Sequence, residues 1–201
     1  MNIEYFTTCI FGFIALYDVC NIVDLSERIL AIINAIYITS YSIECILKED
    51  WYNTNIFYCL VSYFLQDIIV GIVFWKNYTK EKLILDFIHH SITIYGTYEL
   101  LNYSDVLFRK CMIYSLLIEI STIFMHLGMI SYNYIGSKLL IKINAILFLI
   151  SFILLRIIMI TYINIIFYMN SYEFIYVSLP FCILQYFYLY KFIKSAKQEF
   201  M

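Results

Sequence analysis

Two adjacent histidines lie within an apolar segment of the chain and are its most informative chemical feature. His89 and His90 occur in the segment LILDFIHHSITIYGTYELL, and the only other histidine is His126. Ionisable side chains are costly to keep at membrane depth, so a buried pair of them predicts a functional site. The ordinary pKa of imidazole is about 6.5, so a histidine held by a carboxylate can act first as a general base and then as a general acid.

Polar residues near the histidines repeat at the spacing of one helix face. The segment 83–101 carries four of them at i, i+4, i+7 and i+11, beside His89: Asp86, His90, Thr93 and Thr97. The segment 107–130 repeats this spacing with Ser115, Glu119, Thr122 and His126. Residues so spaced share a helix face. We expect both faces, with Asp67 and Arg156 from neighbouring segments, to meet in a shared interior, because buried charged groups need each other or water.

Such a set of residues favours proton transfer over metal chemistry. With Asp86 or Glu119 as the orienting acid, a histidine could deprotonate an amine or hydroxyl and assist acyl transfer to it. Three histidines are too few for a membrane di-iron enzyme. A zinc site from His89, His90 and Glu119 is disfavoured, because adjacent helical residues point about 100° apart. The six cysteines show no CxxC spacing, so we expect no metal and no resident cofactor.

Several of these residues also have a structural explanation. Arg156 is explained as a counter-ion for Asp67 or Glu119, since buried charge is normally paired. The hydroxyl residues on these segments are typical of helix packing: Thr93, Thr97, Ser115, Ser121 and Thr122. Asp86 lies about three residues inside its predicted span, so we expect it near the interface between membrane and cytosol. His126 is expected closer to the membrane rim than to the site.

The composition indicates a membrane protein. Hydrophobic residues make up 63% of the 201 residues and charged residues 14%, a balance that a soluble domain would not tolerate on its surface. Apolar runs of this length favour helices over a barrel. We predict an all-α bundle of about seven membrane-spanning helices, near residues 4–23, 29–47, 55–75, 83–101, 107–130, 139–168 and 174–193.

The basic residues predict the orientation of this bundle. Seven spans leave Lys48, Arg109 and Lys110 on one side of the membrane. The other side then holds most of the basic residues: Arg28, Lys76, Lys80, Lys82, Lys138, Lys142, Lys191, Lys194 and Lys197. The positive-inside rule predicts a cytosolic C-terminus and an N-terminus on the opposite side. No basic patch interleaved with aromatic residues suggests a nucleic-acid partner.

Several segments together resemble a known family. SYFLQDIIVGIVFW, DFIHHSITIYGTYELL, SLLIEISTIFMHLGMI, NAILFLISFILLRI and LQYFYLYKFIKSAK are similar to successive helices of a TLC domain. The resemblance covers residues 28–197, preceded by a membrane helix in 1–27 and followed by a short cytosolic end at 198–201. Carried over by position, it implicates six residues: Asp67, His89, His90, Glu119, Ser121 and Arg156.

The resemblance implies two alternative functions. Ceramide synthases of this family join the acyl group of acyl-CoA to the amine of a long-chain base, and their HisHis-x-x-Thr pattern is present here as His89, His90 and Thr93. Their His-Asp on the next helix is replaced by Ile118 and Glu119. The chain therefore looks closer to small TLC-domain proteins of lipid homeostasis and trafficking, and we favour lipid binding without turnover. The resemblance also suggests the endoplasmic reticulum.

The alternative is an acyltransferase of ceramide synthase type. His89 or His90 would be its general base, and acyl-CoA would approach from the cytosolic side. Three lysines there could meet the phosphates: Lys76, Lys80 and Lys82. Membrane lipids are the expected partners under either hypothesis.

Overall fold

The computed structural model describes the whole chain except residues 1–2, 21, 103 and 201. Nine α-helices make up most of the described part, which contains no strand: α1 (Ile3–Cys20), α2 (Val23–Leu47), α3 (Asn55–Val73), α4 (Lys80–Asn102), α5 (Val106–Ser115), α6 (Glu119–Ile130), α7 (Lys138–Ser151), α8 (Ile160–Met169) and α9 (Ile175–Phe200). Short 3-10 helices form η1 (Trp75–Asn77) and η2 (Leu116–Ile118). Two π-helical stretches form η3 (Ser131–Ile135) and η4 (Phe152–Met159).

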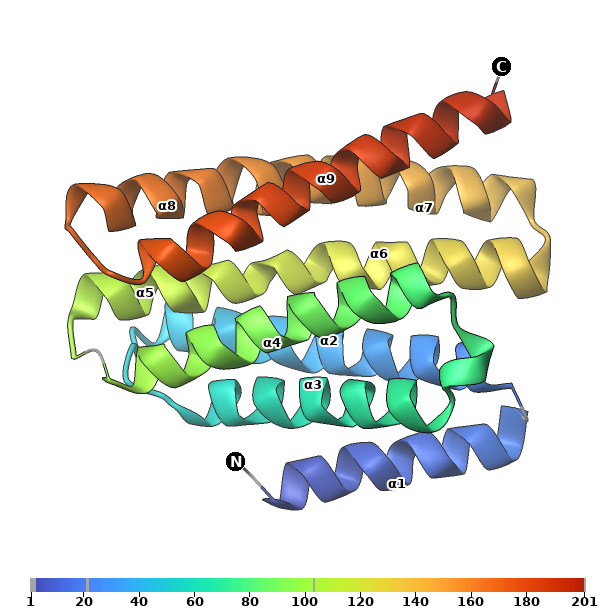
Figure 1. Cartoon of the computed structure of the whole chain (residues 1–201), viewed down its shortest axis with the longest axis horizontal. Coiled ribbons are helices and arrows are strands. Elements are labelled where there is room, and N and C mark those ends of the chain that lie inside the picture. The colour runs from blue at the N-terminus through green and yellow to red at the C-terminus, as the bar shows by residue number, and fades with distance from the viewer. Residues whose placement is uncertain (1–2, 21, 103, 201) are drawn as a thin grey trace.

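These elements combine into long rods that run back and forth along one axis (Figure 1). The η2 turn joins α5 to α6, and η4 joins α7 to α8, so each pair continues as one rod. In the described part of the chain the rods number seven, and each corresponds to one of the predicted spans. The prediction of an all-α transmembrane bundle is confirmed.

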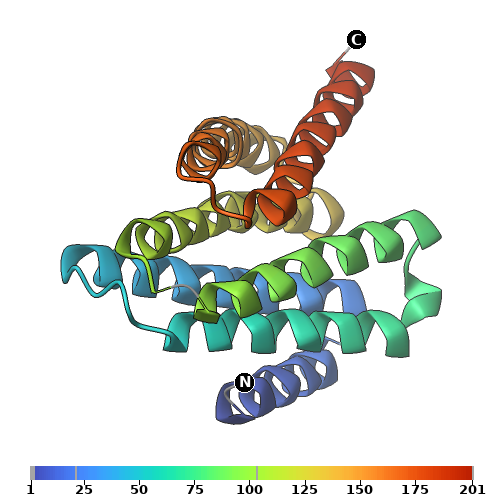
Figure 2. The same cartoon turned by 60° about the vertical axis from the view of Figure 1, so that its left-hand side comes forward.

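Four rods are long and apolar enough to cross a membrane by themselves: Val23–Leu47, Asn55–Val73, Val106–Ile135 and Lys138–Met169. In Figure 2, α1 lies at one edge of the bundle, and α7–α8 and α9 lie at the opposite edge. Large apolar side chains are exposed along the rods, for example Ile146 at 59% and Tyr162 at 63%. A lipid environment accounts for such exposure, since in water these surfaces would lose the free energy of apolar burial. The chain is therefore an integral membrane protein.

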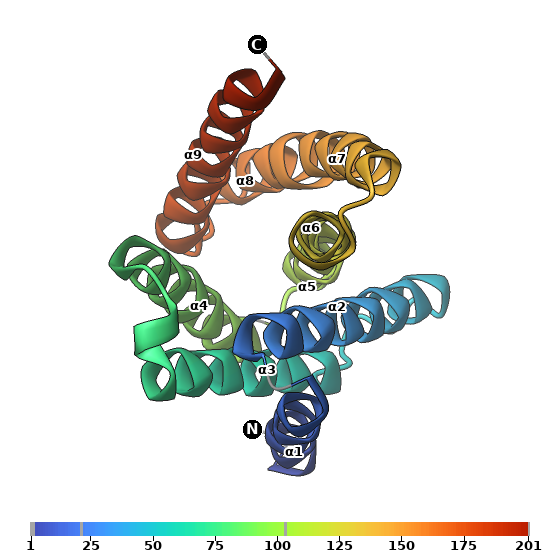
Figure 3. The ribbon, with the colours of Figure 1, turned by 90° about the vertical axis from the view of Figure 1, so that its right-hand side faces the viewer.

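Viewed along the rods, α2, α3, α4, α9, α7–α8 and α5–α6 surround a common interior (Figure 3). The main core fills it with side chains that are almost fully buried: Ile38, Ile56, Phe57, Phe108, Ile113 and Phe167. A second cluster joins α1 to α2 and α3 through Phe13, Val23, Leu30 and Val70. The α4 helix carries three ionisable residues of the predicted site, which are Asp86, His89 and His90.

An aromatic cluster closes one end of the interior. Phe108 stacks on Phe167 at 5.2 Å between ring centroids and meets Phe174 edge-on at 5.2 Å. Tyr172 packs edge-on against Phe108 and donates a hydrogen bond to Asp105. Asp105 also caps α5 by accepting from the Phe108 amide at 2.8 Å. The Tyr172 hydrogen bond and this cap hold the pKa of Asp105 below its usual range. The cluster thus ties the α4–α5 loop to the α8–α9 loop.

Candidate functional site

Irregular turns position two of the charged residues. Glu119 begins α6 directly after the 3-10 turn η2, and Arg156 lies within the π-helical stretch η4. Such departures from α-helical hydrogen bonding change the angle at which the following side chains project, and they are frequent at functional sites. Glu119 and Arg156 are both buried, with 6% and 8% of their surfaces exposed. The two irregularities thus bring an acid and a cation into the bundle interior.

A central cavity of about 80 Å³ lies among α3, α4, α5–α6, α8 and α9. Its polar lining residues are His89, Thr93, Thr97, Ser115, Glu119, Asn164 and Ser178, and most of its wall is apolar. This volume is several times the roughly 10–15 Å³ that one water molecule needs. His89 and Glu119 thus face the same space, as expected for a shared interior.

His89 has an unused nitrogen beside this cavity. Its Nδ1 atom is buried without a hydrogen-bond partner, and its ring stacks on Phe181 at a centroid distance of 5.4 Å. The nearby amide and hydroxyl of Asn164 and Ser178 bind each other at 2.8 Å. An unpartnered imidazole nitrogen in a mostly apolar wall is a group that a ligand can engage.

His90 faces a second, outer cavity of about 460 Å³ between α3, η1 and α4. Its Nε2 atom lies 3.6 Å from Asp67 Oδ2, and both side chains are mostly buried. Of the acids considered from the sequence, Asp67 is the one within ion-pairing distance of His90. Asp86 also lines the outer cavity and does not line the central one.

The polar residues of α4 therefore line two different cavities. Asp86 and His90 line the outer cavity, whereas His89, Thr93 and Thr97 line the central one. The single shared interior expected for this face is corrected to two spaces that follow one another along α4, because the N-terminal half of the helix borders the outer cavity and the C-terminal half borders the central one. Thr93 donates to the His89 carbonyl at 2.9 Å and Thr97 to the Thr93 carbonyl at 2.9 Å. Both hydroxyls thus bond back to their own helix.

Arg156 is held by neutral groups in place of the carboxylate expected from the sequence. Its guanidinium donates to Ser121 Oγ at 2.6 Å, to Thr122 Oγ1 at 2.6 Å and to Gln185 Oε1 at 3.1 Å. Glu119 begins the helix that carries Ser121 and Thr122, and both carboxylate and guanidinium are buried. In the described structure Arg156 is therefore bound by hydroxyl and amide groups near Glu119 and forms no direct ion pair with it.

The sequence reasoning missed several residues of the site. Gln185 and Asn164 each stand as a lone amide in an apolar run, and that signal could have identified them. Gln185 is fully buried and binds Arg156, and Asn164 lines the central cavity. Phe64 lies against both histidine rings. It had no distinguishing signal, because the chain contains 17 phenylalanines.

The described structure places the third histidine outside both cavities and groups no side chains for metal binding. His126 lies on α6 and is absent from the lining of both cavities. Among the described residues, no three histidine, cysteine, aspartate or glutamate side chains are grouped to hold a metal ion.

Comparison with known proteins gives one match. The chain matches the TLC domain over residues 2–194, which is nearly its whole length. No curated protein and no solved structure matches the chain. The family boundary at residue 28 that we expected from the sequence stays a prediction, as do the membrane helix in 1–27 and the end segment 198–201. The chain belongs to the TLC domain family.

Proposed function

We propose that this protein binds a membrane lipid in the central cavity and acts in lipid homeostasis, sensing or trafficking. The polar group of the lipid would lie at His89 and Glu119, and its chain along the apolar wall. The observation that carries this proposal is the unpartnered Nδ1 atom of His89, which is buried beside a cavity that Glu119 also lines.

The energetics support a bound ligand at this position. A buried polar atom without a hydrogen bond costs about 1–3 kcal/mol. A ligand hydroxyl or amide beside His89 would remove that cost. Each methylene placed against the apolar wall would contribute about 0.8 kcal/mol in water, and less when the chain is transferred from lipid. The polar contact is therefore the main source of specificity.

The lining also indicates the class of lipid. No lysine or arginine occurs among the described residues that line the central cavity, whereas Glu119 does. Arg156 is not among these lining residues, and its guanidinium donates hydrogen bonds to three side chains. A small uncharged or cationic polar group is therefore favoured over an anionic one. The narrow cavity favours a single chain over a phospholipid.

Native mass spectrometry of the purified protein tests the proposal. We expect a co-purifying lipid in the wild type that is lost in His89→Ala. The matched control is His126→Ala, which removes a histidine that lines neither cavity and should keep the lipid. An unchanged lipid profile in His89→Ala would contradict the proposal.

Acyl transfer is the second candidate function, and the pairing of His90 with Asp67 favours it. In this reaction the amine of a long-chain base attacks the thioester carbonyl of acyl-CoA. The C–N bond forms as the C–S bond breaks, and the amine proton passes through His90 to the departing thiolate. Lys76 and Lys80 lie beside the outer cavity's Trp75 and Tyr78 in the chain and could meet the phosphates of the CoA.

Labelled acyl-CoA and a long-chain base, supplied to the protein in lipid, test this candidate. The expected result is an amide product that Asp67→Asn and His90→Ala diminish. If no histidine-dependent product appears across several chain lengths, the transferase function is excluded and lipid binding stands alone. The endoplasmic reticulum is the compartment we propose for either function.

A further inference from the structure

Three carboxylates from three different helices line the outer cavity. Glu27 comes from α2, Asp67 from α3 and Asp86 from α4. No lysine or arginine occurs among the described residues of this lining. The volume of about 460 Å³ lies within the roughly 300–1,000 Å³ that is typical of pockets for small organic groups. The cavity therefore has the space for an organic group, and its lining favours a positive group over a negative one.

An organic ammonium matches these acids better than a bare metal ion does. Among the described residues, no three histidine, cysteine, aspartate or glutamate side chains are grouped to hold a metal. A primary ammonium carries three N–H donors that point in different directions, and its hydrogen bonds to carboxylates are charge-assisted. Acceptors that are spread over three helices can therefore each meet a different donor of one ammonium.

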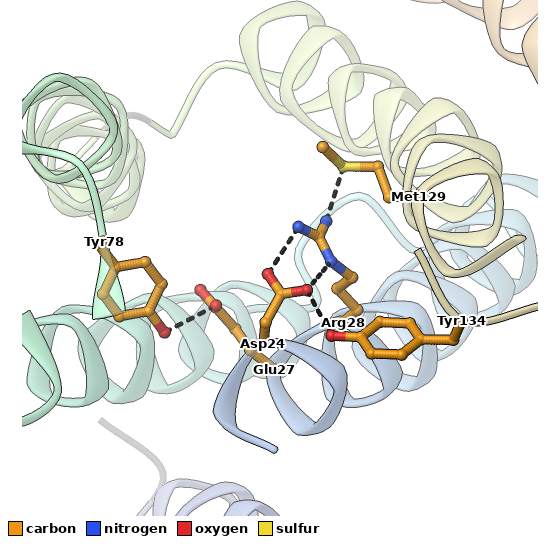
Figure 4. Close-up of polar contacts among 6 residues, drawn as sticks. All are labelled: Asp24, Glu27, Arg28, Tyr78, Met129 and Tyr134. Carbon is orange, nitrogen blue, oxygen red and sulfur yellow. Dashed lines mark hydrogen bonds and ion pairs between the residues drawn. The ribbon is translucent and has the colours of Figure 1, made fainter. Parts of the chain in front are cut away.

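Contacts outside and inside the cavity fix Glu27 in its wall. Tyr78 also lines the cavity and donates to Glu27 at 2.8 Å (Figure 4). Burial and the Glu27 carboxylate raise the pKa of Tyr78, so its hydroxyl keeps the donated proton. The neighbouring Arg28 binds Asp24 at 2.7 Å and donates to Met129 Sδ, and none of these three residues lines the cavity (Figure 4). The arginine next to Glu27 in the sequence is thus engaged elsewhere.

A lysine lies beside the exposed part of the same cavity. The Nζ atom of Lys76 is 5.9 Å from the ring centroid of Trp75, which lines the cavity. Trp75 is 57% exposed, whereas the side chain of Asp67 is only 11% exposed. Both Lys76 and Trp75 belong to η1, the turn from α3 to α4, and aromatic residues in such turns are typical of a membrane interface. A positive group thus stands near the exposed part of the cavity, and negative groups line it.

Exposed apolar side chains complete the surroundings of this cavity. Ile72 is 65% exposed, Ile84 is 59% exposed and Phe87 is 56% exposed, and all three are lining residues. In a bilayer such side chains face lipid tails, so the cavity borders both the lipid and the membrane interface. Its lining therefore suits a molecule with a charged headgroup and apolar chains.

We propose that the outer cavity binds the headgroup of a zwitterionic phospholipid with a primary ammonium, which is the chemistry of phosphatidylethanolamine. The ammonium donates to the three carboxylates, the phosphate lies at Lys76, and the acyl chains follow the exposed apolar side chains. A choline headgroup has no N–H group to donate, so the carboxylates favour the primary ammonium. This second lipid site goes beyond the function proposed above and does not depend on a ligand in the central cavity.

Native mass spectrometry with a series of N-methylated lipids tests the headgroup. The added lipids share their acyl chains and are phosphatidylethanolamine, its N-methyl and N,N-dimethyl derivatives, and phosphatidylcholine. We expect binding to weaken as methyl groups replace the N–H donors, with phosphatidylethanolamine bound roughly tenfold more tightly than phosphatidylcholine, a difference of about 1.4 kcal/mol. Equal binding along the series overturns the proposal, and so does tighter binding of the anionic phosphatidylglycerol.

Carboxylate variants test the site of the ammonium. Glu27→Gln and Asp67→Asn should each reduce the preference for phosphatidylethanolamine over phosphatidylcholine several-fold. Glutamine at position 27 keeps an oxygen that accepts from Tyr78, so the wall of the cavity is retained. The matched control is Glu99→Gln on α4, which lines neither cavity and should keep the full preference. Because the preference compares two lipids on the same folded molecules, a loss of folded protein does not imitate the expected result. A full preference in both cavity variants overturns the assignment.

A lysine variant tests the site of the phosphate. Lys76→Ala should weaken phosphatidylethanolamine and phosphatidylcholine alike, since both carry the phosphate, and should leave their ratio unchanged. The control Lys138→Ala removes an exposed lysine at the start of α7, outside both cavities, and should change neither affinity. Wild-type affinities in Lys76→Ala overturn the phosphate contact.

One further variant separates this site from the central one. His89→Ala should lose the lipid of the central cavity and keep phosphatidylethanolamine, because His89 does not line the outer cavity. If His89→Ala abolishes the preference for phosphatidylethanolamine, the second site is overturned. If the variant keeps every lipid, the central site fails and the outer site stands.

Discussion

The two histidines, although adjacent in the chain, do not act in one place. His89 presents its ring to the central cavity, and His90 presents its ring to the outer cavity, where Asp67 lies within 3.6 Å. The 100° step between helical neighbours produces this division. The two histidines therefore face different spaces and different neighbours. This arrangement does not suit joint ligation of a single ion.

Arg156→Lys is the sharpest test of the buried polar network. The guanidinium serves three acceptors in three directions, on α6 and α9, and a lysine ammonium at the end of a flexible chain cannot match that planar arrangement. We expect a loss of about 1–3 kcal/mol in stability, as for a buried acceptor left without its hydrogen bond. The measurement is thermal unfolding in detergent, followed by the exposure of the buried cysteines. A melting temperature equal to that of the wild type would show that the network contributes nothing.

Among the elements, α4 is the one on which the site depends. Its N-terminal half lines the outer cavity and its C-terminal half lines the central one. Gly96 allows α4 to approach the aromatic cluster, because a Cβ atom there would lie 2.9 Å from Phe174 Cζ. Phe174 cannot move aside easily, since Phe108 and Phe167 pack against its ring. The part of the central cavity that Gly96 and Phe174 line therefore depends on this close contact.

Gly96→Ala should destabilise the bundle. Overpacking of a tight core costs about 1–3 kcal/mol, which outweighs the gain of up to about 1 kcal/mol from replacing a helical glycine. Gly128→Ala on α6 is the matched control, since its new Cβ would meet Asn144 at an ordinary 3.5 Å. We expect the control to be neutral or slightly stabilised, and Phe174→Leu to rescue Gly96→Ala, in the same unfolding assay. Equal melting temperatures for the two alanine variants would contradict a tight contact at Gly96.

On the scale of the whole molecule, the rods divide the loops into two sets at opposite ends of the bundle. The loops after α1, α3 and α6 lie at one end together with the C-terminal part of α9 (Figure 1). This end carries most of the basic residues, among them Lys76, Lys138 and Lys191. The positive-inside rule predicts that this is the cytosolic end. The outer cavity lies toward this end, beside Tyr78 and Glu27, so we expect it to be reached from the cytosolic leaflet.

Tags at the two ends of the chain test this orientation. In intact microsomes, a protease added outside should remove a C-terminal tag, because the C-terminus is expected in the cytosol. A glycosylation acceptor placed before the first helix should be modified, because that end is expected in the lumen. Two tags on the same face would require an even number of spans and would contradict the orientation.

The helices themselves were predictable from the sequence. Each apolar run became a rod close to its predicted limits; the run predicted at 55–75, for example, is the helix Asn55–Val73. The burial of Glu119 and Arg156 also followed from their place in such runs. Backbone hydrogen bonds must be satisfied within each segment in a membrane, so an apolar run of sufficient length determines a helix without help from its neighbours.

Tertiary structure alone decided the partners and the cavities. The rotation and packing of the helices decide that His90 meets Asp67, that Arg156 binds Gln185 and two hydroxyls, and that Phe64 stacks on His90. The 3-10 and π turns beside Glu119 and Arg156 alter that rotation locally. Helix periodicity leaves rotation uncertain by about one residue, or 100°. That angle is enough to move a side chain from one cavity to the other.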